Sequence, residues 1–272
     1  MGRSNRGPRK GEGKDRAKGS DASARPVRSG GRSAADRAEA RRRRAEIERR
    51  DLRRRRIRRL VIVGGLFVAV VVFLVVELFI HRLDAEEQRL LDQAPAAAVE
   101  ASCTGVRTIQ PYPGGKDRTH VGGSDLPKLP PLSSYPSVPP ASGPHAPVPL
   151  SAGVYSNPPD IGEAIHSLEH AAVIIWLDPS AMSDPQAEAI KAFFSRGDQR
   201  NHVIVAPYDY PNAGPAGSLP GGRQMALVAW HHVRYCDRPN LPVAFDFVYH
   251  YRYDIYHRGA YRGDAPEKLA PI

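Results

Sequence analysis

The feature that most constrains the fold is an uninterrupted apolar run at residues 60–80, LVIVGGLFVAVVVFLVVELFI, whose one charged side chain is Glu77. A helix rises 1.5 Å per residue, so about 20 apolar residues cross a hydrocarbon core of roughly 30 Å. A buried core helix rarely runs this long without a polar face. A signal peptide would be shorter, begin earlier and end at a small-residue cleavage site. The run therefore predicts a transmembrane helix that anchors the chain.

Charge is distributed very unevenly around this run. The chain has 39 Lys+Arg and 29 Asp+Glu, and 23 of the basic residues but only 8 of the acidic ones precede residue 60. Basic flanks stay cytoplasmic, so the N-terminus is expected inside the cell and residues 81–272 outside the cell membrane. Anionic lipid is then a simpler partner for the basic tail than nucleic acid. The mildly acidic outer body argues against a nucleic-acid-binding domain.

Composition divides the chain further. In the basic tail, residues 1–59, the first 35 residues are rich in Gly, Ser, Arg and Lys and are expected to be disordered, and the rest favours helix. Residues 81–100 are expected to form a stalk, residues 101–258 one outer domain and residues 259–272 a C-terminal tail. The domain begins with a proline-rich loop over residues 104–160. Aromatic and branched side chains indicate that this loop packs onto the domain: Tyr112, Val121, Leu126, Leu132, Tyr135, Val138, Val148 and Tyr155.

Regular structure is expected from residue 160 onward. Residues 161–170 predict a short helix, and the apolar run AAVIIWL at residues 171–177 predicts a strand. Ser183 or Asp184 as a cap, followed by Pro185, predicts a second helix over residues 183–197. Residues 202–206 predict another strand, residues 224–233 a third strand or a short helix, and residues 241–256 a last helix. This order predicts an α+β fold, in which helices flank a small mixed sheet with a parallel, right-handed strand–helix–strand unit.

Five short motifs occur in order along the chain: THV at 119–121, PPASGPH at 139–145, GVY at 153–155, HSLEH at 166–170 and AW at 229–230. Together they resemble the bacterial membrane-anchored family called domain of unknown function 3105, over roughly residues 101–257. Two positions depart from the pattern, because Ala171 stands where the family usually has Gly and Ala141 where it has Thr. The resemblance implies an extracytoplasmic domain fused to an N-terminal membrane span. It supplies no activity.

Histidines carry the chemistry that the sequence suggests. His166 and His170 are four residues apart on one face of a predicted helix, where two imidazoles can chelate one metal ion. His145 lies in a loop stiffened by Pro and Gly, and His120 lies in a similar loop. We therefore expect these four histidines to bind copper or zinc, with copper slightly ahead. Glu169 would be a further ligand or would accept a ring N–H.

Other interpretations of these residues stay open. Met225 could be a soft ligand for copper, although an ordinary core methionine is the simpler interpretation. Each histidine could instead be a structural residue bound to loop carbonyls. The remaining histidines have no comparable context: His81, His202, His231, His232, His250 and His257, of which His250 and His257 are expected on a solvated helix face.

An enzymatic interpretation also has to be considered. HSLEH fits the H-x-x-E-H pattern, in which two histidines bind zinc and the glutamate is a general base. That class needs a distal acidic ligand on another helix, and the only glutamates after His170 are Glu188 in the next helix and Glu267 in the tail. No Gly-rich phosphate loop and no G-x-S-x-G turn is present. The sequence favours a non-enzymatic role. The alternative to a metal-binding domain is a non-catalytic module for interaction or assembly in the cell envelope, bound to a membrane-complex protein.

Cys103 and Cys236 are the two cysteines of the chain. In an oxidising compartment they are expected to form a disulfide, which would tie the start of the proline-rich loop to the segment after the third strand. Two unpaired thiols are the alternative. The chain has no C-x-x-C motif, so thiol–disulfide catalysis is not supported.

Overall fold

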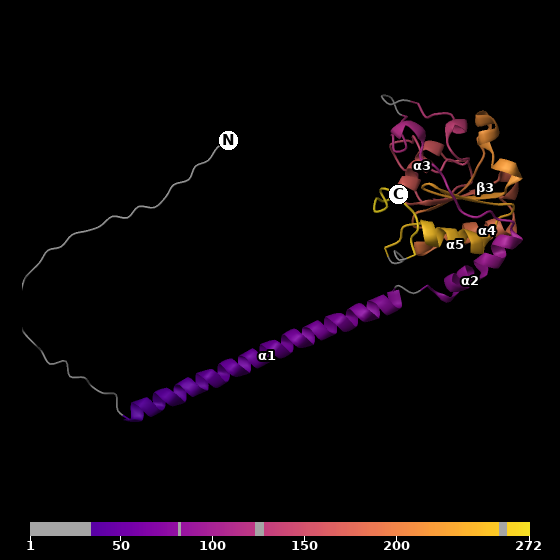
Figure 1. Ribbon diagram of the computed structural model, residues 1–272. Coiled ribbons are helices and arrows are strands. Elements are labelled where there is room, and N and C mark those ends of the chain that lie inside the picture. The colour runs from indigo at the N-terminus through magenta and orange to yellow at the C-terminus, as the bar shows by residue number, and fades with distance from the viewer. Residues whose placement is uncertain (1–33, 81–82, 123–127, 256–259) are drawn as a thin grey trace, which may run out of the picture. The chain divides into compact units, whose positions relative to one another are not determined.

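The computed structural model describes residues 34–80, 83–122, 128–255 and 260–272, and the chain divides into two compact units, Met1–Val70 and Val71–Ile272. Helix α1 (Ala34–Ile80) begins in the basic segment and continues through the apolar run (Figure 1). Among the described residues, it is the one helix long and apolar enough to cross a membrane. The predicted disordered segment lies outside the described residues as far as residue 33.

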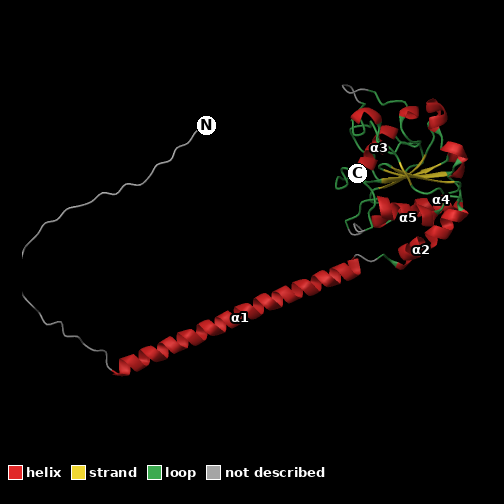
Figure 2. Ribbon diagram, in the orientation of Figure 1, coloured by secondary structure: helices red, strands yellow, loops and turns green. Residues whose placement is uncertain are grey.

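The second unit is built on one six-stranded sheet with the strand order β1-β6-β5-β3-β4-β2 (Figure 2). The strands are β1 (Arg107–Thr108), β2 (Gly153–Val154), β3 (Val173–Leu177), β4 (Val203–Pro207), β5 (Met225–Ala229) and β6 (His232–Cys236). β2, β3 and β4 are parallel to one another. β5 runs antiparallel to β3, β6 runs antiparallel to β5, and β1 runs antiparallel to β6. The predicted α+β fold and the predicted parallel unit of β3 and β4 are confirmed.

Helices cover both faces of this sheet (Figure 2). They are α2 (Ala85–Glu100), α3 (Ile161–Glu169), α4 (Pro185–Phe194) and α5 (Leu241–Tyr251). Ile174 and Trp176 of β3 belong to the core that includes α3. The alternate residues of β3 belong to the core that includes α2, α4 and α5. A strand that is apolar on both faces is what a central parallel strand requires.

Residues 85–100, expected to form a stalk, instead belong to the folded unit as helix α2. Asp84 and Glu87 form a capping box, because the carboxylate of each accepts a hydrogen bond from the backbone N–H of the other, at 2.7 and 2.8 Å. The buried face of α2 packs against α5 and consists mainly of alanine. Because alanine gives a weak amphipathic pattern, the packing of this helix was not predicted.

The proline-rich loop packs onto the sheet, as its apolar residues predicted. Leu132 and Tyr135 are buried in the core with α3, whereas Val148 is exposed, and Leu126 lies outside the described residues. The predicted disulfide is present between Cys103 and Cys236, and joins the segment after α2 to the end of β6.

Of the two alternatives predicted for residues 224–233, the strand is confirmed as β5, but it ends at Ala229 and not at residue 233. This segment contains β5, a tight turn at Trp230 and His231, and the first residues of β6. The turn has none of the Gly, Asn or Asp residues that mark most hairpins. His231 instead adopts the left-handed conformation, with φ of 60°.

Candidate functional site

Three histidines and one glutamate meet at the C-terminal end of α3. His120, His145, His166 and Glu169 each offer one ligand atom, and these four atoms all lie within 4.8 Å of one another. We call these four residues the His/Glu cluster. His120 is exposed and the other three residues are buried. The rings of the three histidines lie 4.9 to 5.0 Å apart between centroids.

Helix α3 presents two members of the cluster on a firmly capped last turn. Asp160 caps its first turn by accepting from the backbone N–H of Glu163 at 3.0 Å. At the other end, the N–H of Ala171 donates to the carbonyl of Leu168 and that of Ala172 to the carbonyl of Ser167, both at 3.0 Å. These two bonds form a Schellman motif. Ala171 adopts φ of 62° there, a conformation that favours glycine and so explains the glycine of the family pattern.

The two loop histidines are held together by backbone hydrogen bonds. The N–H of Val121 donates to the carbonyl of His145 at 2.7 Å, and the N–H of His145 donates to the carbonyl of Thr119 at 3.0 Å. Gly143 has φ of 123°, and a Cβ at this position would lie 2.8 Å from the ring of Tyr135. The SGPH segment therefore fixes His145 through a glycine that no other residue can replace without strain.

Three rings have their proton positions set by backbone carbonyls. Nδ1 of His145 lies 2.7 Å from the carbonyl of Gly143, and Nδ1 of His166 lies 2.6 Å from the carbonyl of Ala146. Nδ1 of His170 lies 2.9 Å from the carbonyl of Pro271. A carbonyl can only accept, so each Nδ1 carries the hydrogen. In the neutral form of each ring, Nε2 then has a free lone pair, which is the arrangement that orients histidine ligands in metal sites.

These Nε2 atoms point at other acceptors. Nε2 of His166 lies 3.1 Å from Nε2 of His170. Nε2 of His145 lies 3.0 Å from Oε2 of Glu169, but the geometry is not that of a hydrogen bond, and this buried nitrogen has no hydrogen-bond partner. Lone pairs at such distances repel unless a proton or a cation lies between them.

Arg118 balances the charge of the cluster. Its Nε donates to Oε1 of Glu169, and its Nη2 donates to Oε1 of Glu267 at 2.6 Å. Burial alone would raise the pKa of Glu169, but the His145 ring, where it carries a proton toward the carboxylate, and the Arg118 guanidinium outweigh it and lower that pKa. Burial and the neighbouring imidazoles lower the pKa of His166, despite the opposing effect of the Ala146 carbonyl. Glu169 is therefore an anion and His166 a neutral imidazole at neutral pH.

The other residues proposed from the sequence lie differently. His170 adjoins the cluster through His166 and contacts Oε2 of Glu267 at 3.4 Å. Met225 is a buried core residue on the α2, α4 and α5 side of the sheet, away from α3. Glu169 is 1% exposed and bound to Arg118, so the H-x-x-E-H motif lacks the solvent-accessible base that a zinc hydrolase needs.

One charged network was missed in the sequence. Nε2 of His231 lies 2.8 Å from Oδ2 of Asp117, and its Nδ1 lies 3.0 Å from Oδ2 of Asp264. His232 also contacts Asp264, at 3.4 Å. No sequence pattern connects these residues, since folding alone brings the β5–β6 turn against two distant segments. Of the two histidines expected on a solvated face, His250 is partly buried and bound to a backbone carbonyl, and His257 lies outside the described residues.

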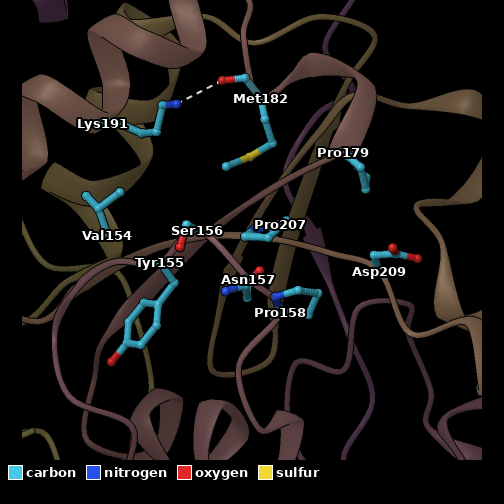
Figure 3. Close-up of a pocket in the computed structure, with 10 residues that line it drawn as sticks. All are labelled: Val154, Tyr155, Ser156, Asn157, Pro158, Pro179, Met182, Lys191, Pro207 and Asp209. Carbon is cyan, nitrogen blue, oxygen red and sulfur yellow. Dashed lines mark hydrogen bonds between the residues drawn. The ribbon is translucent and has the colours of Figure 1, made fainter.

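A separate crevice of about 590 Å³ lies at the carboxyl ends of β2, β3 and β4 (Figure 3). Its lining includes Lys191 and Met182 on one side and Asp209 on the other. Nζ of Lys191 donates to the carbonyl of Met182 at 2.8 Å. Ligands of parallel sheets often bind at this edge. However, no buried polar atom of the lining lacks a partner, so the crevice does not indicate a class of ligand.

The fold and the cluster together define a class: an α+β domain with a buried His/Glu site, in a chain with one candidate membrane helix. Residues 132–263 match the model of a family described as "Protein of unknown function (DUF3105)". This match supports the family resemblance that the motifs indicated, and it includes three of the four cluster residues, since only His120 precedes it. A search of curated proteins and a search of solved structures each found no match.

Proposed function

We propose that this domain binds one transition-metal ion through His120, His145, His166 and Glu169. The observation that carries the proposal is the buried Nε2 of His145, which has no hydrogen-bond partner and lies 3.0 Å from a carboxylate oxygen. An ion between these atoms would satisfy both. The backbone carbonyls that accept from Nδ1 would serve to orient the rings and raise their basicity.

The donor set supports zinc over copper(I). Three imidazole nitrogens and one carboxylate oxygen suit Zn²⁺, and also Cu²⁺. Copper(I) prefers thiolate and thioether ligands. Among the described residues the cluster contains no sulfur ligand, and Met225 lies in the other core. The donor set therefore disfavours copper(I), leaves Cu²⁺ and Zn²⁺ as the candidate ions, and makes zinc the ion to test first.

The same residues support a structural role for the ion rather than a catalytic one. Its ligands come from two loops and one helix, so a bound ion would cross-link the proline-rich loop to α3. Four protein ligands without an open position are typical of structural zinc sites. Of the four ligands, His120 is exposed and the other three are buried.

The location of the domain is part of the proposal. The basic residues of α1 precede its apolar part, which supports a cytoplasmic N-terminus beside anionic lipid and a domain outside the cell membrane. The disulfide between Cys103 and Cys236 supports an oxidising compartment. The domain would thus take its metal from outside the cytoplasm.

Metal analysis of the full-length chain, purified in detergent and dialysed against zinc, tests the proposal. The expected content is about one ion per chain, as for a single tetrahedral site. His166→Gln should lose the ion. His250→Gln is the matched control, because His250 is also partly buried and bound through Nδ1 to a carbonyl. A metal-free wild type, or equal metal content in both variants, would reject the proposal.

A further inference from the structure

The donor atoms around the His/Glu cluster are graded in their exposure. The side chains of His145 and Glu169 are 0% and 1% exposed, so a hydrated ion first meets a more exposed donor. The side chain of His170 is 9% exposed and that of Glu267 is 42% exposed. Glu267 and His170 are thus more exposed than the buried ligands, as is His120 on the cluster itself.

The spacing of these donors is short at each step. Oε2 of Glu267 lies 3.4 Å from Nε2 of His170, which lies 3.1 Å from Nε2 of His166. Two atoms that bind one zinc ion at about 2.0–2.2 Å are separated by no more than about 4 Å. An ion can therefore bind the next donor in this series before it leaves the previous one.

Arg118 orients the carboxylates of Glu169 and Glu267 in the same way. It binds Oε1 of Glu169 and Oε1 of Glu267, and so leaves Oε2 of each directed at a histidine, His145 and His170 respectively. The outer pair Glu267 and His170 thereby repeats the carboxylate–imidazole arrangement of the inner pair.

The C-terminal segment holds Glu267 in place while leaving its side chain accessible. The N–H of Glu267 donates to the carbonyl of Glu169 at 3.0 Å, and the carbonyl of Pro271 accepts from Nδ1 of His170 at 2.9 Å. The chain end accordingly lies beside α3 (Figure 1). These hydrogen bonds fix the backbone around Glu267, while its half-exposed carboxylate stays accessible to an ion that it binds transiently.

We infer that Glu267 and His170 form an outer metal site, through which a divalent transition ion enters and leaves the His/Glu cluster. This inference rests on the proposed function. A hydrated ion exchanges one water for Oε2 of Glu267, a second for Nε2 of His170, and then passes to His166, Glu169 and His145. Any proton on these nitrogens is released to solvent, and nothing is oxidised or reduced.

Zinc uptake and release kinetics of the full-length chain in detergent test the inference. Uptake is followed by stopped flow with a chromophoric zinc chelator, and release by transfer to excess chelator. Glu267→Gln, which keeps the shape of the side chain, should slow both rates by roughly tenfold. The equilibrium affinity should stay unchanged, because a donor that binds the ion only during transfer lowers the barrier equally in both directions. Glu188→Gln is the matched control, because Glu188 is an exposed glutamate paired with Lys191 elsewhere.

Each result of this experiment is decisive. Slower uptake and slower release at unchanged affinity support the outer site. Unchanged rates in Glu267→Gln overturn it while the proposed function stands. Faster uptake would show that Glu267 only obstructs the cluster. Weaker affinity with faster release would make it a permanent ligand. Both of these outcomes also overturn the inference. A wild-type chain that takes up no zinc rejects the proposed function itself.

Discussion

Nε2 of His166 lies 3.1 Å from Nε2 of His170, although each ring already donates its Nδ1 hydrogen to a backbone carbonyl. The two facing nitrogens therefore present lone pairs to each other unless an ion or an extra proton separates them. A purely structural histidine network would pair donors with acceptors, as the Ser167 hydroxyl of the same helix does with the carbonyl of Leu150. The unpaired acceptors distinguish this site from such a network.

The left-handed residue after α3 gives a first prediction. Ala171→Gly should stabilise the fold by about 0.5–1 kcal/mol, because glycine adopts the φ of 62° observed at this position without strain. This value is the net gain after the loss of the buried methyl group of Ala171. Ala172→Gly is the control. It lacks the positive φ and should destabilise by about 1 kcal/mol. Urea unfolding of both variants measures the difference, and a destabilised Ala171→Gly would contradict the explanation of the family glycine.

Gly143 gives a second prediction. Gly143→Ala places a Cβ 2.8 Å from the ring of Tyr135 at φ of 123°, and should cost about 2–4 kcal/mol. Since Gly143 also positions His145, metal content should fall with stability. Gly114→Ala serves as the comparison, because Gly114 has φ of 74° and open space around it, and should cost only about 1–2 kcal/mol. Equal losses in thermal unfolding would show that the contact with Tyr135 is unimportant.

The charged network at the β5–β6 turn predicts a pH dependence. Burial alone would lower the pKa of His231, but Asp117 and Asp264 outweigh it and raise that pKa. Its stabilising contribution is therefore complete below the unfolded pKa of about 6.5 and is lost as pH rises through the folded value. Hydrogen bonds from His231, Tyr112 and Ser142 lower the pKa of Asp117 against the effect of burial, so its contribution is lost as pH falls from about 4.

His231→Asn tests this dependence, because asparagine tolerates the left-handed conformation but carries no charge. The variant should lose about 1–3 kcal/mol of unfolding free energy at pH 5.5 and clearly less at pH 8.5. Urea titrations of the wild type and the variant at both pH values give the comparison. A loss that is equal at the two values would mean that His231 acts only through packing.

Reduction of the disulfide gives a further prediction. The bond between Cys103 and Cys236 closes a separation of 133 residues, and in the loop-entropy model it stabilises the fold by about 4–5 kcal/mol. A reducing agent should lower the thermal midpoint by several degrees or more. The double variant Cys103→Ser/Cys236→Ser should match the reduced wild type and show no further response to the reductant. A midpoint insensitive to reduction would contradict this contribution.

The sequence predicts those parts of the molecule whose signals are local. The apolar run of β3 and the cap at Asp184 suffice to place the parallel unit of β3, α4 and β4. The spacing of His166 and His170 places both on one turn, and the SGPH loop marks His145. In contrast, the roles of Arg118 and Glu267 depend on contacts 51 and 149 residues apart. No periodicity or motif connects positions so distant, and only the folded chain shows that these residues complete the site.

X-ray absorption at the zinc edge of the full-length, zinc-loaded chain tests directly whether the His/Glu cluster binds an ion. Four nitrogen and oxygen neighbours at about 2.0–2.1 Å are expected, with the outer-shell scattering of three imidazoles. A spectrum with water oxygens alone, or with sulfur neighbours, would contradict the proposed site.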